Sequence, residues 1–342
     1  MTPEKFYENF NLIREEIAKV VVGQEVAIEQ LLAGFFAEGH LLLTGLPGLG
    51  RTLIVKTLAE IMNLDYNRLQ FTPDLLPTDI IGSEILVSDK FGGDRSFKFY
   101  KGPIFANLVL ADELNRSPAR TQSALLEVMQ EHQVTVGGKT YYLPKPFSLI
   151  ATLNSLDTEG VWDLGEAQAD RFMMSIPLEY PDEDEEREII EKTTGFGRHK
   201  VKAVTDPETV LAMQQLAKSV PVIPSVQKFA MSIVRLTRPE EAECPAEVKR
   251  TVRLGASTRA VQSLIRGSKV LALARGRQYV TRQDIEFLMG PVLNHRLLLD
   301  YRAQAFGYDI EDVLKAVCKA AWERSLPSVS KWTNQILKGK SE

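Results

Sequence analysis

The stretch Gly45-Leu46-Pro47-Gly48-Leu49-Gly50-Arg51-Thr52 decides the fold class of this chain. It follows an apolar run at residues 41–43, typical of a short buried strand, and leads into apolar residues at helical spacing up to about Met62. Glycines allow several backbone N–H groups to approach a phosphate chain, and the N-terminus of the following helix attracts the same anion. The hydroxyl of Thr52 is suited to Mg²⁺. The stretch therefore predicts a loop that binds the phosphates of a nucleoside triphosphate.

The basic residue of this loop is Arg51, where lysine is usual. Lysine offers a compact and mobile charge to the β- and γ-phosphates, whereas arginine is larger and planar, so the two are not interchangeable at such a site. We expect Arg51 to preserve nucleotide binding and to slow hydrolysis.

A second motif is the run Leu108-Val109-Leu110-Ala111-Asp112-Glu113, in which an apolar strand ends in two acids. Ligands of open α/β sheets bind at the carboxyl ends of the strands, so both carboxylates should lie beside the phosphate loop. We expect Asp112 to hold Mg²⁺, through water, and Glu113 to polarise the attacking water. A strand end with two solvated acids is the alternative interpretation.

Strands and helices alternate through the first half of the chain, which predicts an α/β sheet with helices on both faces. Two pairs of short β-prone runs flank Gly92-Gly93 and Gly137-Gly138-Lys139, and each pair predicts an inserted hairpin. Ser117 and Pro118 are typical of a helix N-cap and first turn. The predicted strands are residues 41–43, 67–71, 107–111, 147–152 and 174–178, the last an outer strand, and residues 119–130 are a predicted helix.

Strand signals fade after Asp182, and the rest of the chain is predicted to be helical. We therefore predict an α/β nucleotide-binding domain over residues 1–194 and a helical domain with a polar C-terminal tail over residues 195–342. The boundary is expected near Gly195.

Composition excludes several other classes of protein. Apolar residues make up 44% of the chain and charged residues 25%, as in an ordinary soluble protein, and the net charge of −4 gives no basic footprint for nucleic acid. Two distant cysteines and four scattered histidines form no disulfide framework or metal motif. We expect no signal peptide and no membrane span, and hence a cytoplasmic protein.

Taken together, the motifs resemble those of AAA+ ATPases of the MoxR branch, in the clade with an insert in its second helix. The resemblance covers residues 21–313. It rests on the two motifs above and on four further segments: Val22-Gly23-Gln24, Glu166-Ala167-Gln168-Ala169-Asp170-Arg171-Phe172, Gly255-Ala256-Ser257-Thr258-Arg259-Ala260 and Asn294-His295-Arg296.

The resemblance implies a P-loop NTPase (AAA+) fold, with a parallel sheet core and a C-terminal all-helical lid domain. It implies that Asn154 is the first sensor, holding water near the γ-phosphate, although Leu153 and Ser155 depart from the commoner neighbours. Arg171 would be the arginine finger, reaching the nucleotide of the neighbouring subunit; where measured, such an arginine raises the rate of phosphoryl transfer by roughly 10³–10⁵. Arg259 would contact the γ-phosphate from the lid. Mg²⁺ would be held by Thr52 and Asp112, and catalysis would depend on Glu113, Asn154, Arg171 and Arg259. The residues expected to bind ATP or ADP are Val22, Gly23, Gln24, Gly45, Pro47, Gly48, Leu49, Gly50, Arg51, Thr52 and Leu53.

Three functions follow from the resemblance. The first is an ATP-hydrolysing chaperone or motor that forms a ring, expected to have six subunits. It would mature partner complexes or insert cofactors into them, together with a separate protein carrying a von Willebrand factor A domain. The second, motivated by Arg51, is an assembly switch that binds nucleotide and turns it over slowly or not at all. The third is a chelatase-type motor subunit for metal insertion. Arg116 is a candidate second interface arginine, and His295 beside Arg296 a candidate contact between domains.

Overall fold

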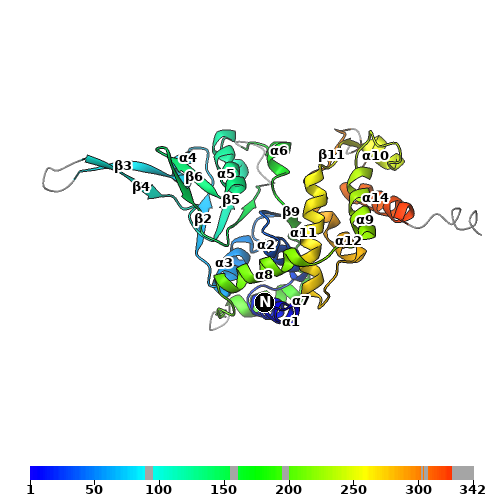
Figure 1. Ribbon diagram of the computed structural model, residues 1–342, viewed down its shortest axis with the longest axis horizontal. Coiled ribbons are helices and arrows are strands. Elements are labelled where there is room, and N and C mark those ends of the chain that lie inside the picture. Colours follow the sequence, from blue (N-terminus) through cyan, green and yellow to red (C-terminus); the bar gives the residue numbers. More distant parts are fainter. Residues whose placement is uncertain (89–94, 155–160, 195–199, 302, 304–306, 326–342) are drawn as a thin grey trace, which may run out of the picture.

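The computed structural model describes residues 1–88, 95–154, 161–194, 200–301, 303 and 307–325 (Figure 1). Its centre is a sheet of five parallel strands in the order β2-β5-β8-β1-β9, so that β9 is an outer strand as predicted. The carboxyl ends of all five strands therefore meet at one edge. The strands are β1 (Leu41–Thr44), β2 (Tyr66–Gln70), β5 (Leu108–Asp112), β8 (Ser148–Thr152) and β9 (Met174–Pro177).

Helices cover both faces of this sheet, as the sequence predicted. Leu41 and Leu43 of β1 belong to one hydrophobic core, and Leu42 between them belongs to another, because successive strand residues point to opposite faces. The first core is shared with the C-terminal helices. It includes α1 (Pro3–Ala18), α2 (Glu25–Phe36) and α3 (Arg51–Ile61), whereas the second includes α4 (Pro77–Ile81) and α5 (Ala119–Glu131).

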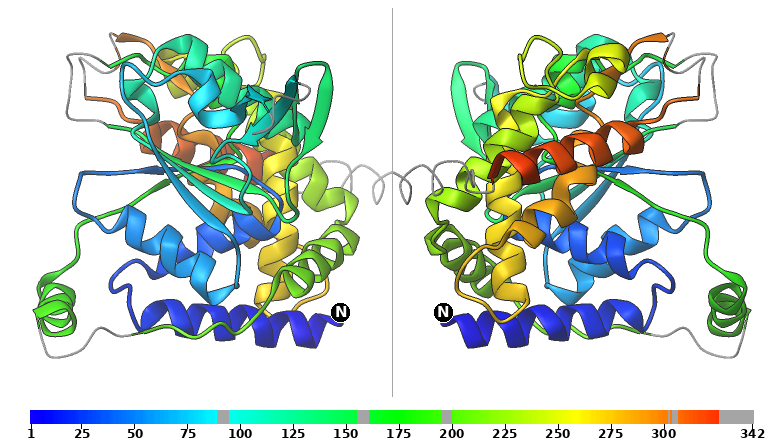
Figure 2. Two further views of the ribbon diagram at one scale, coloured as in Figure 1. Left: turned by 90° about the vertical axis from the view of Figure 1, so that its left-hand side faces the viewer. Right: turned by 90° about the vertical axis from the view of Figure 1, so that its right-hand side faces the viewer.

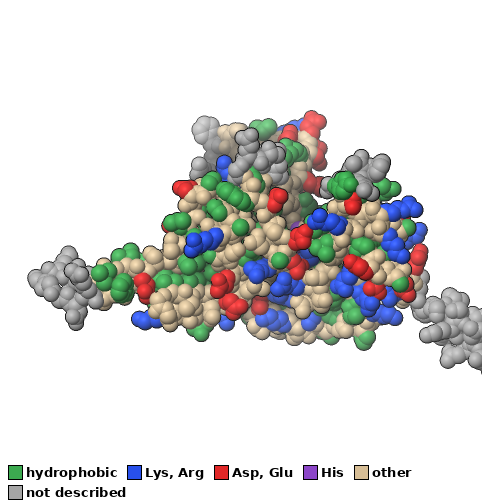
Figure 3. All heavy atoms as spheres, turned by 90° about the horizontal axis from the view of Figure 1, so that it is seen from above, with side chains coloured by type: hydrophobic (Ala, Val, Ile, Leu, Met, Phe, Trp, Pro, Cys, Tyr) green, Lys and Arg blue, Asp and Glu red, His purple; other side chains and the backbone are tan. Residues whose placement is uncertain are grey.

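Both predicted hairpins are present. β3 (Gly82–Ser88) pairs with β4 (Arg95–Lys101), and β6 (Gln133–Val136) pairs with β7 (Lys139–Tyr142). The rings of Phe99 and Tyr141 stack with their centroids 4.2 Å apart, which joins the two hairpins. The β3–β4 hairpin projects away from the sheet (Figure 1), and hydrophobic side chains are exposed along it in the view of Figure 3.

The start of α5 differs from the expectation. Pro118 has an extended ψ of 152° and occupies the N-cap, so the helix begins at Ala119. Ser117 does not cap it, because its Oγ donates to the carbonyl of Leu114 at 3.1 Å instead. The hydroxyl therefore closes the preceding turn.

The C-terminal part is helical, and it also contains one short antiparallel sheet of β10 (Val252–Leu254) and β11 (Leu298–Leu299). The predicted boundary at Gly195 and the tail from residue 327 lie outside the described residues. No helix in the described part of the chain is long and apolar enough to cross a membrane. The helices are α7 (Glu183–Thr194), α8 (Pro207–Ser219), α9 (Pro224–Leu236), α10 (Ala246–Thr251), α11 (Thr258–Ala274), α12 (Arg282–Leu293) and α14 (Ile310–Ser325).

One helix stands apart from this arrangement. Figure 2 shows α7, in green, at the periphery of the molecule, and none of its residues is buried. α11, in contrast, packs against α1, α2 and α8 and continues the first core into the lid. α12 also packs against β9, so both helices hold the lid to the sheet domain.

Candidate nucleotide-binding site

The predicted phosphate loop connects β1 to α3 and lies at the carboxyl edge of the sheet. Gly45 has a φ of 130°, and a Cβ at this position would come within 2.7 Å of the Leu178 carbonyl oxygen, so only glycine fits. Gly48 and Gly50 have φ values of 91° and 76°, with no atom within 4 Å of a built Cβ. The loop therefore leaves open space above glycine backbone at the start of α3, which suits a phosphate chain.

Arg51 crosses from the start of α3 to the end of β8. Its Nη1 donates to the carbonyl oxygen of Leu153 at 3.1 Å, beside Asn154. The guanidinium is thus anchored to backbone through one of its nitrogens, Nη1.

The two acids after β5 are joined by one hydroxyl. Thr152 Oγ1 donates to Asp112 Oδ1 at 2.6 Å and accepts from the Glu113 backbone N–H at 2.8 Å. Asp112 is buried, and its other oxygen, Oδ2, accepts from Arg68 Nη2 at 2.6 Å and Nε at 3.0 Å. Sequence reasoning missed both Thr152 and Arg68, since neither belongs to a motif.

Glu113 has a left-handed backbone, with φ 57° and ψ 49°, which costs a non-glycine residue roughly 1 kcal/mol or more. Its carboxylate Oε2 accepts from Gln70 Nε2 at 3.0 Å and from Arg116 Nη1 at 3.1 Å. The carboxylate expected to polarise water is therefore held by two donors. Arg116 pairs with a residue of its own chain in this structure, and its side chain is 42% exposed.

Asn154 is positioned by a second asparagine that the sequence did not single out. The side chain of Asn115 donates to the Asn154 carbonyl and accepts from its N–H, both at 2.8 Å. Asn115 is buried in η1 (Leu114–Arg116), the short turn that also carries Arg116. The turn after β5 thus fixes the backbone at the end of β8.

The segment on the other side of the loop is Val22-Gly23-Gln24. Gln24 Nε2 donates to the Glu179 carbonyl at 2.8 Å, just beyond β9. Gly23 has a φ of 71°, and a Cβ there would lie 2.5 Å from Glu185 Oε2. This segment and the loop residue Gly45 thus both contact the chain that follows β9.

Arg171 and Arg259 lie together in a different place. Both line a pocket of about 440 Å³, to which Arg266, Arg296 and Lys218 also contribute. None of the described residues 45–53 lines this pocket. The structure thus brings the two predicted arginines together, but not with the loop of their own chain.

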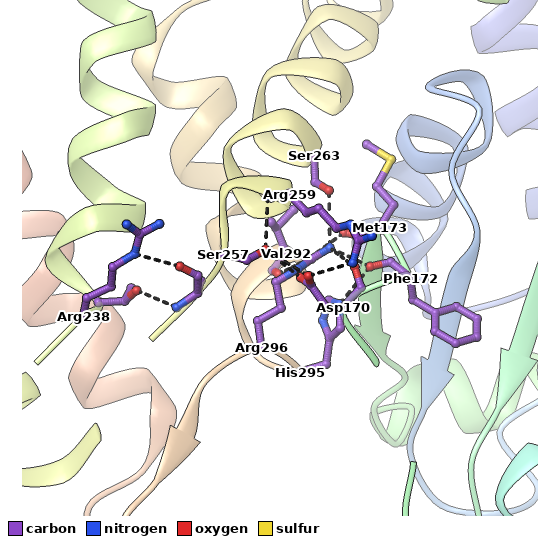
Figure 4. A network of polar contacts seen from close by, with 12 residues as sticks. Asp170, Phe172, Met173, Arg238, Ser257, Arg259, Ser263, Val292, His295 and Arg296 are labelled. Carbon is purple, nitrogen blue, oxygen red and sulfur yellow. Dashed lines mark hydrogen bonds and ion pairs between the residues drawn. The ribbon is translucent and has the colours of Figure 1, made fainter. Parts of the chain in front are cut away.

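Asp170 organises this second group (Figure 4). Its carboxylate accepts from Arg296 Nε at 2.8 Å and from Ser257 Oγ at 2.9 Å, and it pairs with Arg259 Nη1 at 3.3 Å. Among the described residues, the Arg171 side chain has no hydrogen bond or ion pair. It follows α6 (Glu166–Ala169) and is half-buried.

His295 makes a structural contact with the sheet domain. Its Nε2 lies 3.0 Å from the Phe172 carbonyl, to which it donates. Burial, together with the charge of Arg296, lowers the pKa of His295 to about 3, so the ring is neutral. Burial also lowers the pKa of Arg296 below its usual value, which Asp170 partly offsets.

The parallel sheet, the glycine loop before α3 and the acids at the end of β5 define a P-loop NTPase of the AAA+ class. The model of the ATPase family associated with various cellular activities (AAA) matches residues 40–174, and that of the AAA lid domain matches residues 245–317. The chain belongs to the MoxR family of AAA+ ATPases. It is 41% identical to the chaperone MoxR1 of Mycobacterium tuberculosis over 92% of this chain and 81% of the relative.

Two further proteins agree with this membership. The uncharacterized protein YeaC of Bacillus subtilis is 35% identical over 90% of this chain and 92% of its own length. A solved structure from Cytophaga hutchinsonii, described as that of a candidate ATPase, superimposes with a TM-score of 0.85 at 39% identity, covering 93% of this chain and 96% of that one.

Proposed function

We propose that this chain binds ATP and ADP with Mg²⁺ at the loop of residues 45–52 and hydrolyses ATP. The observation that carries this proposal is the single hydroxyl of Thr152, which fixes Asp112 and Glu113 at the sheet edge beside the loop. Two acidic residues that are both bonded to one buried hydroxyl are more than a solvated strand end.

The residues fit the magnesium nucleotide. The described part of the chain contains no group of three or more His, Cys, Asp or Glu residues that could hold a metal alone. Thr52 and Asp112 would therefore supply a hydroxyl and a carboxylate to a metal that arrives with the phosphates. When bound, Mg²⁺ neutralises charge that develops on the phosphate oxygens.

Each remaining residue has a separate task. Glu113 accepts a proton from, and orients, the attacking water, after its carboxylate is released from Gln70 and Arg116. Asn154 orients the same water, with its backbone held by Asn115. Residues 22–24 line the side of the loop expected for the adenine.

We propose further that Arg171 and Arg259 serve the nucleotide of a neighbouring subunit. They share a pocket with an excess of positive charge, where Arg266, Arg296 and Lys218 outnumber the carboxylates of Glu38 and Asp170. Since no loop residue of their own chain lines this pocket, its anionic partner comes from outside the subunit. In a ring of subunits, six by family resemblance, a nucleotide bound to the neighbouring subunit would supply this negative charge at every interface.

At the level of the cell, we propose a chaperone or motor that matures partner complexes, together with a separate protein carrying a von Willebrand factor A domain. MoxR1, a relative at 41% identity, bears the name chaperone. The chelatase-type motor is the alternative within the same fold. The cytoplasmic location expected from the sequence stays a prediction.

The test is steady-state ATP hydrolysis by wild type, Arg51→Lys and Glu113→Gln. We expect turnover by wild type that Glu113→Gln abolishes and Arg51→Lys increases. If wild type hydrolyses ATP no faster than Glu113→Gln, and only Arg51→Lys is active, the chain is not an ATPase. The assembly switch would then be its function. Absence of any thermal shift with saturating Mg-ATP or Mg-ADP would contradict nucleotide binding itself.

A further inference from the structure

The carboxylate expected to hold Mg²⁺ already carries a cation of the protein. Arg68 lies on β2, the strand beside β5, and its guanidinium makes two hydrogen bonds to Asp112 Oδ2, at 2.6 Å and 3.0 Å. Thr152 occupies the other oxygen, Oδ1, at 2.6 Å. Both oxygens of Asp112 are therefore engaged, and its negative charge is matched by a positive one.

The two partners differ in how freely they can move. The Asp112 side chain is 12% exposed and is fixed at the end of β5, whereas the Arg68 side chain is 48% exposed. Arg68 can therefore leave towards solvent without burying its charge, while Asp112 must stay. The ion pair is therefore expected to break by movement of the Arg68 side chain.

We propose that Arg68 is a built-in competitor of Mg²⁺ for Asp112, displaced each time a magnesium nucleotide binds and restored when it leaves. The proposal rests on the nucleotide site proposed above. A metal held at Asp112, directly or through its water, would place a second positive charge beside the guanidinium, so the metal and Arg68 compete for the carboxylate. Arg68 thereby sets how much Mg²⁺ strengthens nucleotide binding.

Displacement of Arg68 also reaches the second acid. Its Nη2 donates to Gln70 Oε1 at 2.7 Å, and Gln70 in turn holds Glu113. When Arg68 leaves Asp112, the amide of Gln70 loses the donor that orients it. The loading of the metal is thereby coupled to a weaker hold on the Glu113 carboxylate.

The experiment measures binding of a fluorescent ADP analogue to wild type and Arg68→Gln, in excess EDTA and across a Mg²⁺ titration. We expect the ratio of the dissociation constant in EDTA to that in saturating Mg²⁺ to rise roughly two- to fivefold in Arg68→Gln, the range of an ion pair with one half-exposed partner. Half-maximal strengthening should occur at correspondingly lower Mg²⁺. Arg68→Lys keeps the charge but loses the paired guanidinium donors, so its ratio should rise by less than that of Arg68→Gln.

Arg235→Gln is the matched control. Arg235 of α9 is 50% exposed and pairs with Glu241, which is 20% exposed, and neither residue belongs to the proposed nucleotide site, so the ratio should be unchanged. If both Arg68 variants are folded, as thermal melts would show, and their ratio of dissociation constants is unchanged or lower, Arg68 does not compete with Mg²⁺. The proposed nucleotide site would still stand. If no protein binds the analogue with or without Mg²⁺, the proposed function fails, and the role of Arg68 fails with it.

Discussion

At the scale of single residues, Thr152 makes the most consequential contact of the site, because one buried hydroxyl serves both acids. Replacing it with valine keeps the shape but leaves a buried carboxylate oxygen and the Glu113 N–H without partners. Each unsatisfied group costs roughly 1–3 kcal/mol. The side chain thus links the stability of the fold to the geometry of the candidate catalytic centre.

We therefore predict that Thr152→Val lowers the free energy of unfolding by about 2–6 kcal/mol and reduces ATP hydrolysis at least tenfold. Urea unfolding and a steady-state assay measure the two effects. Thr152→Ser retains the hydroxyl and should stay within about 1 kcal/mol of wild type, since it loses only a methyl group. Equal loss in the valine and serine variants would assign the effect to packing rather than to the hydrogen bonds.

The same residue shows where sequence reasoning ends. Asp112 and Glu113 could be predicted because an apolar strand ending in acids is a local pattern. Thr152, Arg68 and Asn115 could not, because each is an ordinary polar residue whose partner lies 39 to 44 positions away. The parallel registers of β2 and β8 against β5, in which Gln70 pairs with Asp112 and Ala151 with Ala111, bring these strand ends together.

At the scale of elements, His40 joins three of them and makes the fold sensitive to acid. It lies before β1, its Nε2 donates to the Met129 carbonyl of α5, and its Nδ1 accepts from the Leu149 N–H of β8, both at 3.0 Å. Burial lowers its pKa from 6.5 to about 4. Protonation of Nδ1 would break the bond to β8.

Because the folded pKa of His40 is depressed, the unfolded chain binds the proton more readily below pH 6.5. Stability is therefore fully present above pH 6.5 and is lost as the pH falls towards 4, by up to about 3 kcal/mol from this residue. Urea unfolding at about pH 7.5 and about pH 5 measures the loss. His40→Gln, which cannot titrate, should show a smaller difference between the two conditions despite lower stability at neutral pH; an equal difference would assign the acid sensitivity to other groups.

The helices and strands were predicted from the sequence more completely than the contacts of the site. The five strands, the two hairpins and the helical C-terminal part follow from apolar runs, glycine turns and helical spacing. The N-cap of α5 was wrong because Ser117 has a nearer acceptor in Leu114, a competition that local propensity does not show.

At the scale of the whole molecule, Arg296 fastens the lid to the sheet domain. Its guanidinium is buried and bonds to the Asp170 carboxylate and to the carbonyls of Phe172 and Met173. We predict that Arg296→Met lowers the free energy of unfolding by about 3 kcal/mol, as expected when one partner of a buried ion pair is removed. Removing the exposed Arg253 should cost less than about 1 kcal/mol in the same urea series, and comparable losses would contradict the anchoring role.

Arg171 and Arg259 lie in a pocket that no loop residue of their own chain lines, and we proposed that they act on a neighbouring nucleotide. We therefore predict that two differently damaged subunits complement each other. A Glu113→Gln subunit keeps intact arginines, and an Arg171→Ala subunit keeps an intact loop. Each alone should be inactive, yet an equal mixture should recover about a quarter of wild-type turnover, the fraction of interfaces at which the good halves meet by chance. On the proposed arrangement, each catalytic site would take its loop and acids from one copy of the chain and its arginines from the next copy.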